Sequence, residues 1–251
     1  MRILTWNLER KKVTSPLGCK AVEYLYGQSP DIMALSETRT DFPRRGGYTI
    51  WSKHPGKSFA RNERKVLLWS KSPWVDVDNI GLDALPKARF VSGETKVRDI
   101  NVRVIGVCIP WHMANVKYGS KDKAPWEDHK IYLDLLPIII AKYSGPLIIA
   151  GDFNQAFPRI KYGNSEAAEK MKKTFKDFHI VSQGVLPELK KAGIDHIAVN
   201  EYFTSKRLWG WPNVIKGDRL SDHDGAGCEL QFDSKFQMLT RYSALKINKY
   251  F

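Results

Sequence analysis

Short apolar runs rich in β-branched and aromatic residues recur along the whole sequence, and they constrain its fold more than any other feature. They are Arg2–Trp6, Ile32–Leu35, Val66–Trp69, Asn101–Ile109, Leu147–Ala150, His196–Val199 and Ala226–Phe232. Runs of this length and composition are typical of buried β-strands. Helical spacing is confined to stretches at about residues 18–26, 127–142 and 165–178. Many strands and few helices favour a β-sandwich with helices on its outer faces over a doubly wound parallel sheet.

The sequence shows no sign of a division into several domains. It has 251 residues, 43% of them hydrophobic, which suffices for a substantial core, and its 27% charged residues exclude disorder as the main state. No internal repeat, low-complexity tract or Pro/Gly/Ser-rich linker interrupts it. We therefore expect one domain over residues 1–251, with a core at about 2–232 and a basic C-terminal extension at 233–251.

The cysteines and the apolar runs bear on the compartment. Three scattered cysteines, Cys19, Cys108 and Cys228, fit neither a disulfide framework nor a zinc ribbon, and they indicate a reducing environment. The first residues lack the basic and apolar regions of a secretion signal. The longest apolar runs, at 135–141 and 146–150, are far too short to span a membrane. These features predict a cytoplasmic protein without membrane contact, and no obligate protein partner is evident.

The net charge of the chain is strongly positive. Lys and Arg number 40 against 27 Asp and Glu, which gives +13 at pH 7 and favours polyanionic partners such as nucleic acid. Basic clusters lie at residues 10–12 and between residues 39 and 65. The residues predicted to contact substrate are Arg44, Arg45, Arg61, Arg64 and Lys65. A solvated surface loop explains either cluster alone equally well, whereas the two together favour a long polyanion.

Polar residues follow most of the apolar runs. They include Asn7, Glu37, His112, Asp152, Asn154, Asp195, Asp222 and His223. Each of them alone is more often a turn former, a helix cap or a surface residue than a functional one. Gathered along one rim of a sandwich, however, their carboxylates, amides and imidazoles would provide an oxygen-rich cation site and an acid/base pair.

These polar residues belong to short motifs that occur in a recognisable order. The motifs are Thr5-Trp6-Asn7, Ser36-Glu37-Thr38, the strand leading to His112, Gly151-Asp152-Phe153-Asn154, Ile194-Asp195-His196 and Ser221-Asp222-His223. In this order the sequence resembles the endonuclease/exonuclease/phosphatase superfamily, which has the DNase I-like fold, over about residues 2–232. The resemblance implies an α/β fold, a four-layer α/β/β/α sandwich whose active site lies where the loops of the two sheets meet. It also implies metal-dependent phosphodiesterase activity.

The resemblance assigns a divalent-cation site. Glu37 would be the principal carboxylate ligand, with Asn7 and Asp222 nearby in the metal shell. Ligands that are all oxygens favour Mg²⁺ over zinc, with Mn²⁺ as a substitute.

The resemblance also implies catalytic roles. Asp152 would orient or deprotonate the attacking water, and Asn154 would hold the phosphate. His223, oriented by Asp195, would be the acid/base or phosphate-stabilising imidazole. His112 would donate to the phosphate oxygens as charge develops on them.

Some residues set this chain apart from individual branches of the superfamily. Abasic-site endonucleases resemble one another through Trp-Asn followed by a further Asn-Gly, whereas Leu8-Glu9-Arg10 follows Asn7 here. His112 stands where that branch usually has Tyr, so a dedicated abasic-site enzyme is less expected. His196 stands where many members have Tyr, and we interpret it as a neighbour of the site.

Trp111, Trp126, Trp209 and Trp211 occupy loop-like stretches near the motifs. Exposed aromatic rings of this kind could stack on the bases of a distorted or single strand. Packing in the core is the usual fate of Trp and is the favoured interpretation. The basic, turn-rich segment at 115–123 is a candidate substrate-contacting loop.

The sequence therefore predicts a divalent-metal-dependent nuclease, either an endonuclease or an exonuclease, that hydrolyses DNA, with RNA as a second candidate substrate. The alternative in the same enzyme class is a phosphatase or phosphodiesterase acting on a small phosphorylated molecule, which the basic clusters disfavour. The alternative from another class is a non-catalytic nucleic-acid binder. The full set of site residues argues against this last interpretation.

Overall fold

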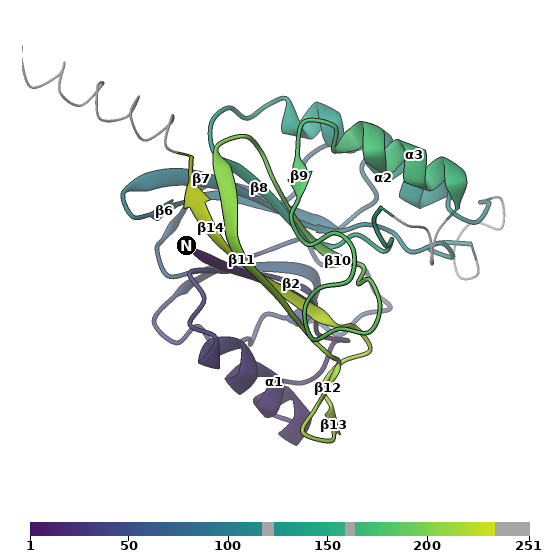
Figure 1. Ribbon diagram of the computed structural model, residues 1–251. Coiled ribbons are helices and arrows are strands. Elements are labelled where there is room, and N and C mark those ends of the chain that lie inside the picture. Colours follow the sequence, from purple (N-terminus) through teal and green to yellow (C-terminus); the bar gives the residue numbers. More distant parts are fainter. Residues whose placement is uncertain (117–122, 159–163, 234–251) are drawn as a thin grey trace, which may run out of the picture.

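The computed structural model describes residues 1–116, 123–158 and 164–233, which form three helices, two large sheets and a small hairpin (Figure 1). The helices are α1 (Pro16–Gly27), α2 (Glu127–Ile140) and α3 (Ser165–Thr174). The first sheet contains β1 (Arg2–Asn7), β2 (Ile32–Arg39), β3 (Tyr48–Trp51), β4 (Glu63–Ser70), β11 (Phe203–Trp211) and β14 (Gly225–Phe232). The second contains β5 (Trp74–Asp78), β6 (Phe90–Val97), β7 (Ile100–Cys108), β8 (Leu147–Asp152), β9 (His179–Ile180) and β10 (Asp195–Val199). The hairpin consists of β12 (Val214–Ile215) and β13 (Asp218–Arg219).

Both large sheets are mixed. The strand order is β11-β14-β1-β2-β4-β3 in the first sheet and β5-β6-β7-β8-β10-β9 in the second. β1 pairs with β2 in parallel and β7 pairs with β8 in parallel, whereas the other pairings are antiparallel. Each parallel pair is joined by a crossover that contains a helix, α1 or α2, as parallel strands require. The carboxyl ends of β1 and β2 therefore reach the same edge of the first sheet.

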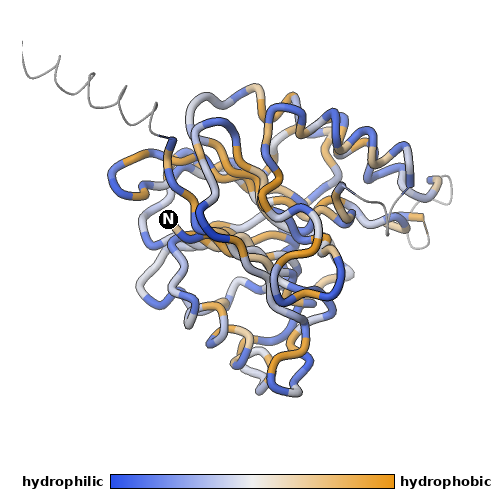
Figure 2. The backbone as a smooth tube through the Cα atoms, viewed as in Figure 1, coloured by the Kyte–Doolittle hydropathy of each residue, from blue (hydrophilic) through white to orange (hydrophobic). Residues whose placement is uncertain are grey.

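The central strands are buried on both faces, because each sheet packs on the other sheet and on a helical layer. Along β1, Ile3 belongs to the core between the sheets, whereas Leu4 and Trp6 pack with Val22 and Leu25 of α1. The outer face of the second sheet packs on α2 and α3 in the same way. Figure 1 shows the helices on opposite sides of the paired sheets, and Figure 2 shows apolar backbone segments concentrated between them. The predicted four-layer α/β/β/α sandwich is confirmed.

Every apolar run that was predicted to be a strand lies wholly or almost wholly in one, and each predicted helix is present within a few residues of its expected bounds. The strands that the apolar pattern did not reveal include β5 and β11, at the edges of the two sheets. Most residues of β5 and β11 are partly or fully exposed, so their sequences lack the continuous apolar character of the central strands. β6 was missed for another reason: it is largely buried but carries Ser92, Glu94 and Thr95.

Parts of two expected segments lie outside the described residues. Of the basic extension at 233–251, the structure describes Asp233 alone. Of the candidate loop at 115–123, residues 117–122 are outside the described ranges. No helix within residues 1–116, 123–158 and 164–233 is long and apolar enough to cross a membrane.

Candidate active site

Polar residues of both sheets meet at one rim of the sandwich, as expected. Asn7 ends β1 and lies in register with Ser36 of β2 in the first sheet. Asp152 ends β8 and is paired with Asp195, the first residue of β10, in the second sheet. His223 precedes β14, which pairs with β1, so it reaches the same rim. Neighbouring strand ends therefore bring residues that are far apart in the sequence to the same rim.

The Asp152 carboxylate is buried at this rim. Its Oδ2 accepts hydrogen bonds from the side-chain amides of Asn7, at 3.0 Å, and Asn154, at 2.9 Å. Its Oδ1 accepts the backbone N–H of Asn154 at 2.8 Å. Burial raises the pKa of Asp152 to about 7 despite these bonds and the opposing effect of the nearby His223 imidazole. A carboxyl group with such a pKa can take up a proton near neutral pH.

The turn after β8 explains the Gly-Asp-Phe-Asn motif. Gly151 has φ +143°, and a Cβ at this position would lie 1.9 Å from the Val107 carbonyl oxygen, so a side chain does not fit. Asn154 has φ +50°, a left-handed conformation that Asn tolerates better than most residues. Its side-chain amide also donates to the Ile109 carbonyl at 2.9 Å. The turn therefore fixes Asn154 against Asp152 from both the backbone and the side chain.

His223 is held by Asp195. The His223 Nδ1 donates to Asp195 Oδ2 at 2.6 Å, and the Asp195 side chain is only 1% exposed. Burial alone lowers the pKa of His223, but the carboxylates of Asp195, Asp152 and Asp222 outweigh it and raise this pKa to about 10. The imidazole is accordingly a cation at neutral pH, with its Nε2 4.0 Å from Asp222 Oδ1. The group is suited to donating a proton or stabilising an anionic oxygen.

Two serines form hydrogen bonds that hold this rim together, and one of them connects the two sheets. The Ser36 Oγ accepts the backbone N–H of Asp152 at 3.1 Å, which ties β2 to β8. The Ser221 Oγ donates to the Asn7 carbonyl at 2.6 Å and accepts the backbone N–H of His223 at 3.1 Å. Neither serine was predicted to have a role. Their positions in the sequence could have identified them, because each immediately precedes an acidic residue of a motif, Glu37 or Asp222.

Glu37 lies among cationic side chains. Its Oε1 accepts from Lys65 Nζ at 2.6 Å, and its Oε2 is 3.3 Å from Arg10 Nε. Burial alone raises the pKa of Glu37, but Lys65, Arg10 and Arg89 outweigh it and hold this pKa below its ordinary value. Arg10 and Arg89 were absent from the predicted site set. Arg10 was visible as part of a basic cluster, whereas nothing in the sequence marked Arg89.

The donors present fit a hard divalent cation. Oxygen and nitrogen atoms of Asp152, Asp195 and His223 lie within 4.8 Å of one another. Asp195 Oδ1 is buried and has no hydrogen-bond partner among the described residues. The lowered pKa of Glu37 keeps it ionised, the state that metal binding requires. The side chain of Asp222 is 47% exposed at the mouth of the site. Carboxylates at this rim could therefore bind a metal ion, and the cluster of Asp152, Asp195 and His223 differs from the predicted ligand set of Glu37, Asn7 and Asp222.

The predicted substrate-binding residues are not all at one place: Arg64 pairs with Thr38 of β2, next to Glu37, whereas Arg45 lies against α1. Arg45 forms an ion pair with Glu23 of α1 and lies over the Tyr26 ring, on the outer side of the first sheet. Arg44 lies over the Trp51 ring, and Arg64 donates to the Arg61 carbonyl. Among the predicted set, the described contacts connect Lys65 directly with Glu37. Arg45 is thus separated from Arg64 and Lys65, which lie beside the Glu37 end of β2.

His112 and the tryptophans divide into two groups. The His112 ring lies between those of Trp111 and Trp126, at 5.0 and 5.6 Å between ring centroids. Trp111 is 44% exposed, whereas Trp211 is fully buried under α1. Trp209 packs at the edge of the same cluster. The core interpretation therefore holds for Trp211. Trp209 and Trp126 are partly buried, and Trp111 is an exposed ring next to His112.

His196 is a buried structural residue. It is 0% exposed, and its Nε2 lies 3.0 Å from the Gln155 carbonyl oxygen, so this nitrogen carries the proton and donates. Its Nδ1 faces the Ser182 hydroxyl at 3.1 Å. Burial lowers the pKa of His196 to about 4. His196 thus holds the loop after Asn154 in place from beneath the site.

Two cavities flank the rim. One, of about 320 Å³, is lined by Asp222, His223 and Asp224 together with Ala156 and residues 191–194. The other, of about 470 Å³, lies on the Glu37 side, where Lys65, Arg89 and Lys123 contribute to its lining. Arg89 also donates to the Cys108 carbonyl at 3.2 Å. Of the acid/base groups, His223 is therefore accessible from the smaller cavity.

Known proteins share this architecture. The chain resembles the 3′ phosphatase NExo from Neisseria bound to product DNA hairpin, with 20% identity, a TM-score of 0.71 and coverage of 93% of this chain and 99% of that one. It also resembles the endonuclease domain of TRAS1, a telomere-specific non-LTR retrotransposon, with 20% identity, a TM-score of 0.60 and coverage of 92% and 98%. For humanized D. rerio TDP2 the values are 12% identity, a TM-score of 0.68 and coverage of 92% and 98%. A search of the curated proteins found no match. At these identities the likenesses show the fold.

The sequence itself matches the model of one protein family across nearly its whole length. The match covers residues 4–223, a range that begins in β1 and ends at His223. It therefore includes Asn7, Glu37, Asp152 and Asp195 together with the strands that bring them to one rim. The chain belongs to the Endonuclease/Exonuclease/phosphatase family.

Proposed function

We propose that this protein is a divalent-metal-dependent phosphodiesterase that hydrolyses nucleic acid, with DNA as its preferred polymer. The observation that carries the proposal is the pair formed by Asp152 and His223. Their pKa values are displaced toward about 7 and about 10, so one is ready to accept a proton while the other carries a positive charge. Two groups whose pKa values are shifted apart in this way are suited to act as the base and the acid of one reaction.

The proposed roles follow from the contacts of each side chain. Asp152 accepts the proton of the attacking water, because its carboxylate is oriented by the amides of Asn7 and Asn154. The His223 cation stabilises the charge on the phosphoryl oxygens, and Asp195 holds its ring and maintains its charge. Asn154 holds the phosphate, and His112 donates to it from the Trp111 side of the rim.

A divalent cation completes the proposed site. Glu37, Asn7 and Asp222 would hold Mg²⁺ or Mn²⁺, the cations that oxygen ligands favour. When bound, the ion would neutralise negative charge on the phosphate that is attacked. Lys65 and Arg10 keep Glu37 ionised and oriented for this purpose.

A polymeric substrate is supported by the charge of the chain and by its relatives. The net charge of +13 favours polyanions over small neutral molecules. The neighbour NExo is represented by two structures, one described as a 3′ phosphatase from Neisseria bound to product DNA hairpin and the other as a 3′-5′ exonuclease from Neisseria meningitidis. We extend nucleic-acid hydrolysis from this neighbour to this chain as part of the proposal.

The proposal is tested by incubating the protein with supercoiled plasmid, single-stranded DNA, single-stranded RNA and an oligonucleotide bearing a 3′ phosphate, with Mg²⁺ or with EDTA. We expect Mg²⁺-dependent cleavage, fastest on DNA, with activity falling steeply as salt concentration rises. Release of phosphate from the 3′ end alone would replace the nuclease by a phosphatase. Hydrolysis of none of these substrates would refute the proposed function and direct attention to small phosphorylated molecules.

A further inference from the structure

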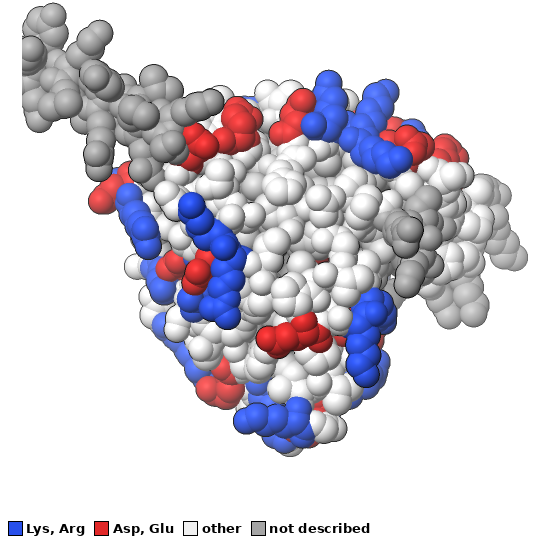
Figure 3. Space-filling view, viewed as in Figure 1, with Lys and Arg blue, Asp and Glu red and all other residues white. Residues whose placement is uncertain are grey.

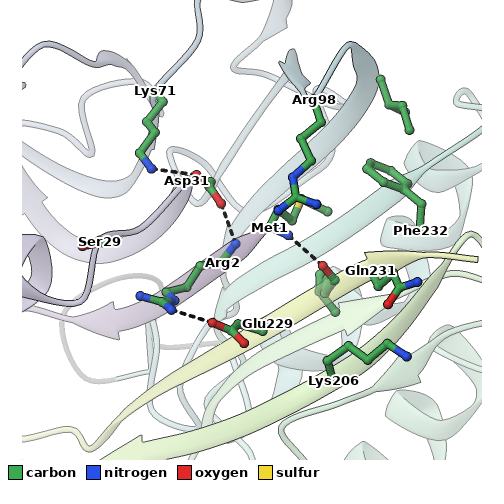
Figure 4. Close-up of a pocket in the computed structure, with 12 residues that line it drawn as sticks. Met1, Arg2, Ser29, Asp31, Lys71, Arg98, Lys206, Glu229, Gln231 and Phe232 are labelled. Carbon is green, nitrogen blue, oxygen red and sulfur yellow. Dashed lines mark hydrogen bonds and ion pairs between the residues drawn. The ribbon is translucent and has the colours of Figure 1, made fainter.

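A cavity of about 890 Å³ lies at the rim of the sandwich opposite the candidate active site (Figure 4). We call it the distal cavity. Its lining is formed by Met1, Arg2, Ser29, Asp31, Lys71, Arg98, Ile100, Lys206 and residues 229–232. These residues come from the beginnings of β1 and β2, the β6–β7 hairpin, β11 and the end of β14. β1 has six residues, so the two rims are separated by about 20 Å at the rise of an extended strand.

The acidic groups of the distal cavity are already paired. Asp31 accepts the backbone N–H of Arg2 at 2.7 Å and the Lys71 Nζ at 2.8 Å. Glu229 accepts the Arg2 guanidinium at 2.5 Å. These contacts, drawn in Figure 4, balance the charges of Arg2 and Lys71 within the cavity.

The charges of Arg98 and Lys206 are not balanced in this way. Both side chains line the cavity, and no carboxylate of residues 1–116, 123–158 or 164–233 forms an ion pair with either. The space-filling view shows Lys and Arg side chains gathered over β11 around fewer acidic ones (Figure 3). The distal cavity therefore has an excess of positive charge that an anionic ligand can neutralise.

The backbone at Arg98 provides an independent observation. Arg98 and Asp99 form the two-residue turn between β6 and β7, and both have positive φ, 50° and 66°. Turns of this type favour Gly or Asn at both positions, because a larger side chain is strained there. The chain thus carries an arginine where the turn would be more stable without one, and backbone strain of this kind is concentrated at functional positions.

We propose that the distal cavity binds the phosphoryl groups of a nucleotide-sized anion through Arg98 and Lys206. Arginine contacts phosphate through paired N–H groups, and lysine adds a compact positive charge. Ile100 and Leu230 supply apolar lining for the remainder of the ligand. The volume is in the range of roughly 300–1,000 Å³ that is typical of small-molecule sites.

Two sources of this chemistry are distinguished by the test: a free nucleotide and a stretch of nucleic-acid strand. The free-nucleotide arm is independent of the proposed function. The strand arm rests on it, since it supposes that the nucleic acid bound at the active site extends to the opposite rim.

The test uses the full chain, labelled with ¹⁵N in metal-free buffer, and two probes, adenosine 5′-monophosphate and a short oligothymidylate. Amide signals of Ile100 and Gln231 report the distal cavity, whereas those of Asp195 and His223 report the active site. The variant Arg98→Gln/Lys206→Gln removes both unpaired charges. The matched control Lys173→Gln/Lys176→Gln removes two exposed charges at and just beyond α3, on the outer side of the second sheet.

We expect a probe to shift the signals of Ile100 and Gln231, and we expect the double variant to weaken this binding by roughly tenfold or more while the control variant matches wild type. Shifts caused by adenosine 5′-monophosphate identify a free nucleotide as a ligand, and shifts caused only by oligothymidylate identify a strand. The proposal is overturned if neither probe shifts these signals, or if the double variant binds both probes as tightly as wild type does. Shifts at Asp195 and His223 alone would leave the proposed function standing and refute the distal site.

Discussion

At the scale of single residues, the opposite pKa displacements of Asp152 and His223 predict a bell-shaped pH dependence of kcat/KM. Activity should rise as Asp152 loses its proton, with an apparent pKa no higher than about 7, since a bound cation lowers it further. It should fall as His223 is deprotonated near pH 10. A pH–rate profile of wild type and His223→Gln checks this expectation. The activity of the variant should no longer fall at alkaline pH. If the fall in activity near pH 10 persists in the variant, His223 is not the acid.

Glu37 is expected to set the metal affinity. Glu37→Gln keeps the shape of the side chain but removes its charge, so the Mg²⁺ concentration for half-maximal activity should rise by roughly tenfold or more. The control is Glu63→Gln, a carboxyl group on β4 that pairs with Arg39 instead. Titration of activity with Mg²⁺ measures both. Equal Mg²⁺ requirements for the two variants would contradict the ligand role of Glu37.

The sequence correctly predicted that residues at the ends of buried strands, such as Asn7, Asp152 and Asp195, lie close together. Their positions follow from strand order alone, because strand ends gather at rims. The contact between Ser36 and Asp152 depends on how one sheet is placed over the other, which no local pattern records. Arg45 was predicted to bind substrate on charge alone, yet it pairs with Glu23 of α1.

At the scale of elements, the end of β8 and the turn that follows it carry much of the site and tolerate little change. Gly151→Ala should lower the free energy of unfolding by about 3 kcal/mol or more, because the new Cβ would meet the Val107 carbonyl at 1.9 Å. Gly145→Ala is the matched control, since Gly145 also has positive φ, +85°, but open space around it. We expect the control to cost only about 1 kcal/mol. Urea denaturation measures the free energy of unfolding of both variants. Equal losses of stability would contradict this expectation and would mean that the backbone beside Val107 shifts to accommodate the new Cβ.

The apolar pattern revealed the central strands except β6, because burial on two faces leaves a continuous run of apolar residues, and helical spacing revealed the three helices of the described residues. It could not reveal β5 or β11, since an edge strand with exposed faces has a sequence like that of a polar loop. β11 matters for the distal cavity, to which it contributes Lys206. That cavity was accordingly invisible in the sequence.

At the scale of the whole molecule, His196 makes the stability of the fold depend on pH. Its pKa is lowered to about 4 by burial, so below its ordinary value of 6.5 the unfolded chain binds a proton that the folded chain does not. Stability should fall as pH drops from 6.5 toward 4, by about 3 kcal/mol from this residue alone. His196→Gln should flatten this slope, and His54→Gln, at an exposed position, should leave it unchanged. Thermal or urea unfolding across this pH range measures both, and an unaltered slope in His196→Gln would contradict the account.

The central claim is that the Asp152 rim of this family member hydrolyses nucleic acid with the help of a metal ion. The most direct test is single-turnover cleavage of a labelled DNA oligonucleotide by wild type and Asp152→Asn in Mg²⁺, with DNA affinity measured in parallel by fluorescence anisotropy. The account predicts a rate lower by roughly 100-fold or more in the variant, with affinity nearly unchanged, because Asp152 acts on the water and not on the binding of DNA. Cleavage by Asp152→Asn at the wild-type rate would contradict it.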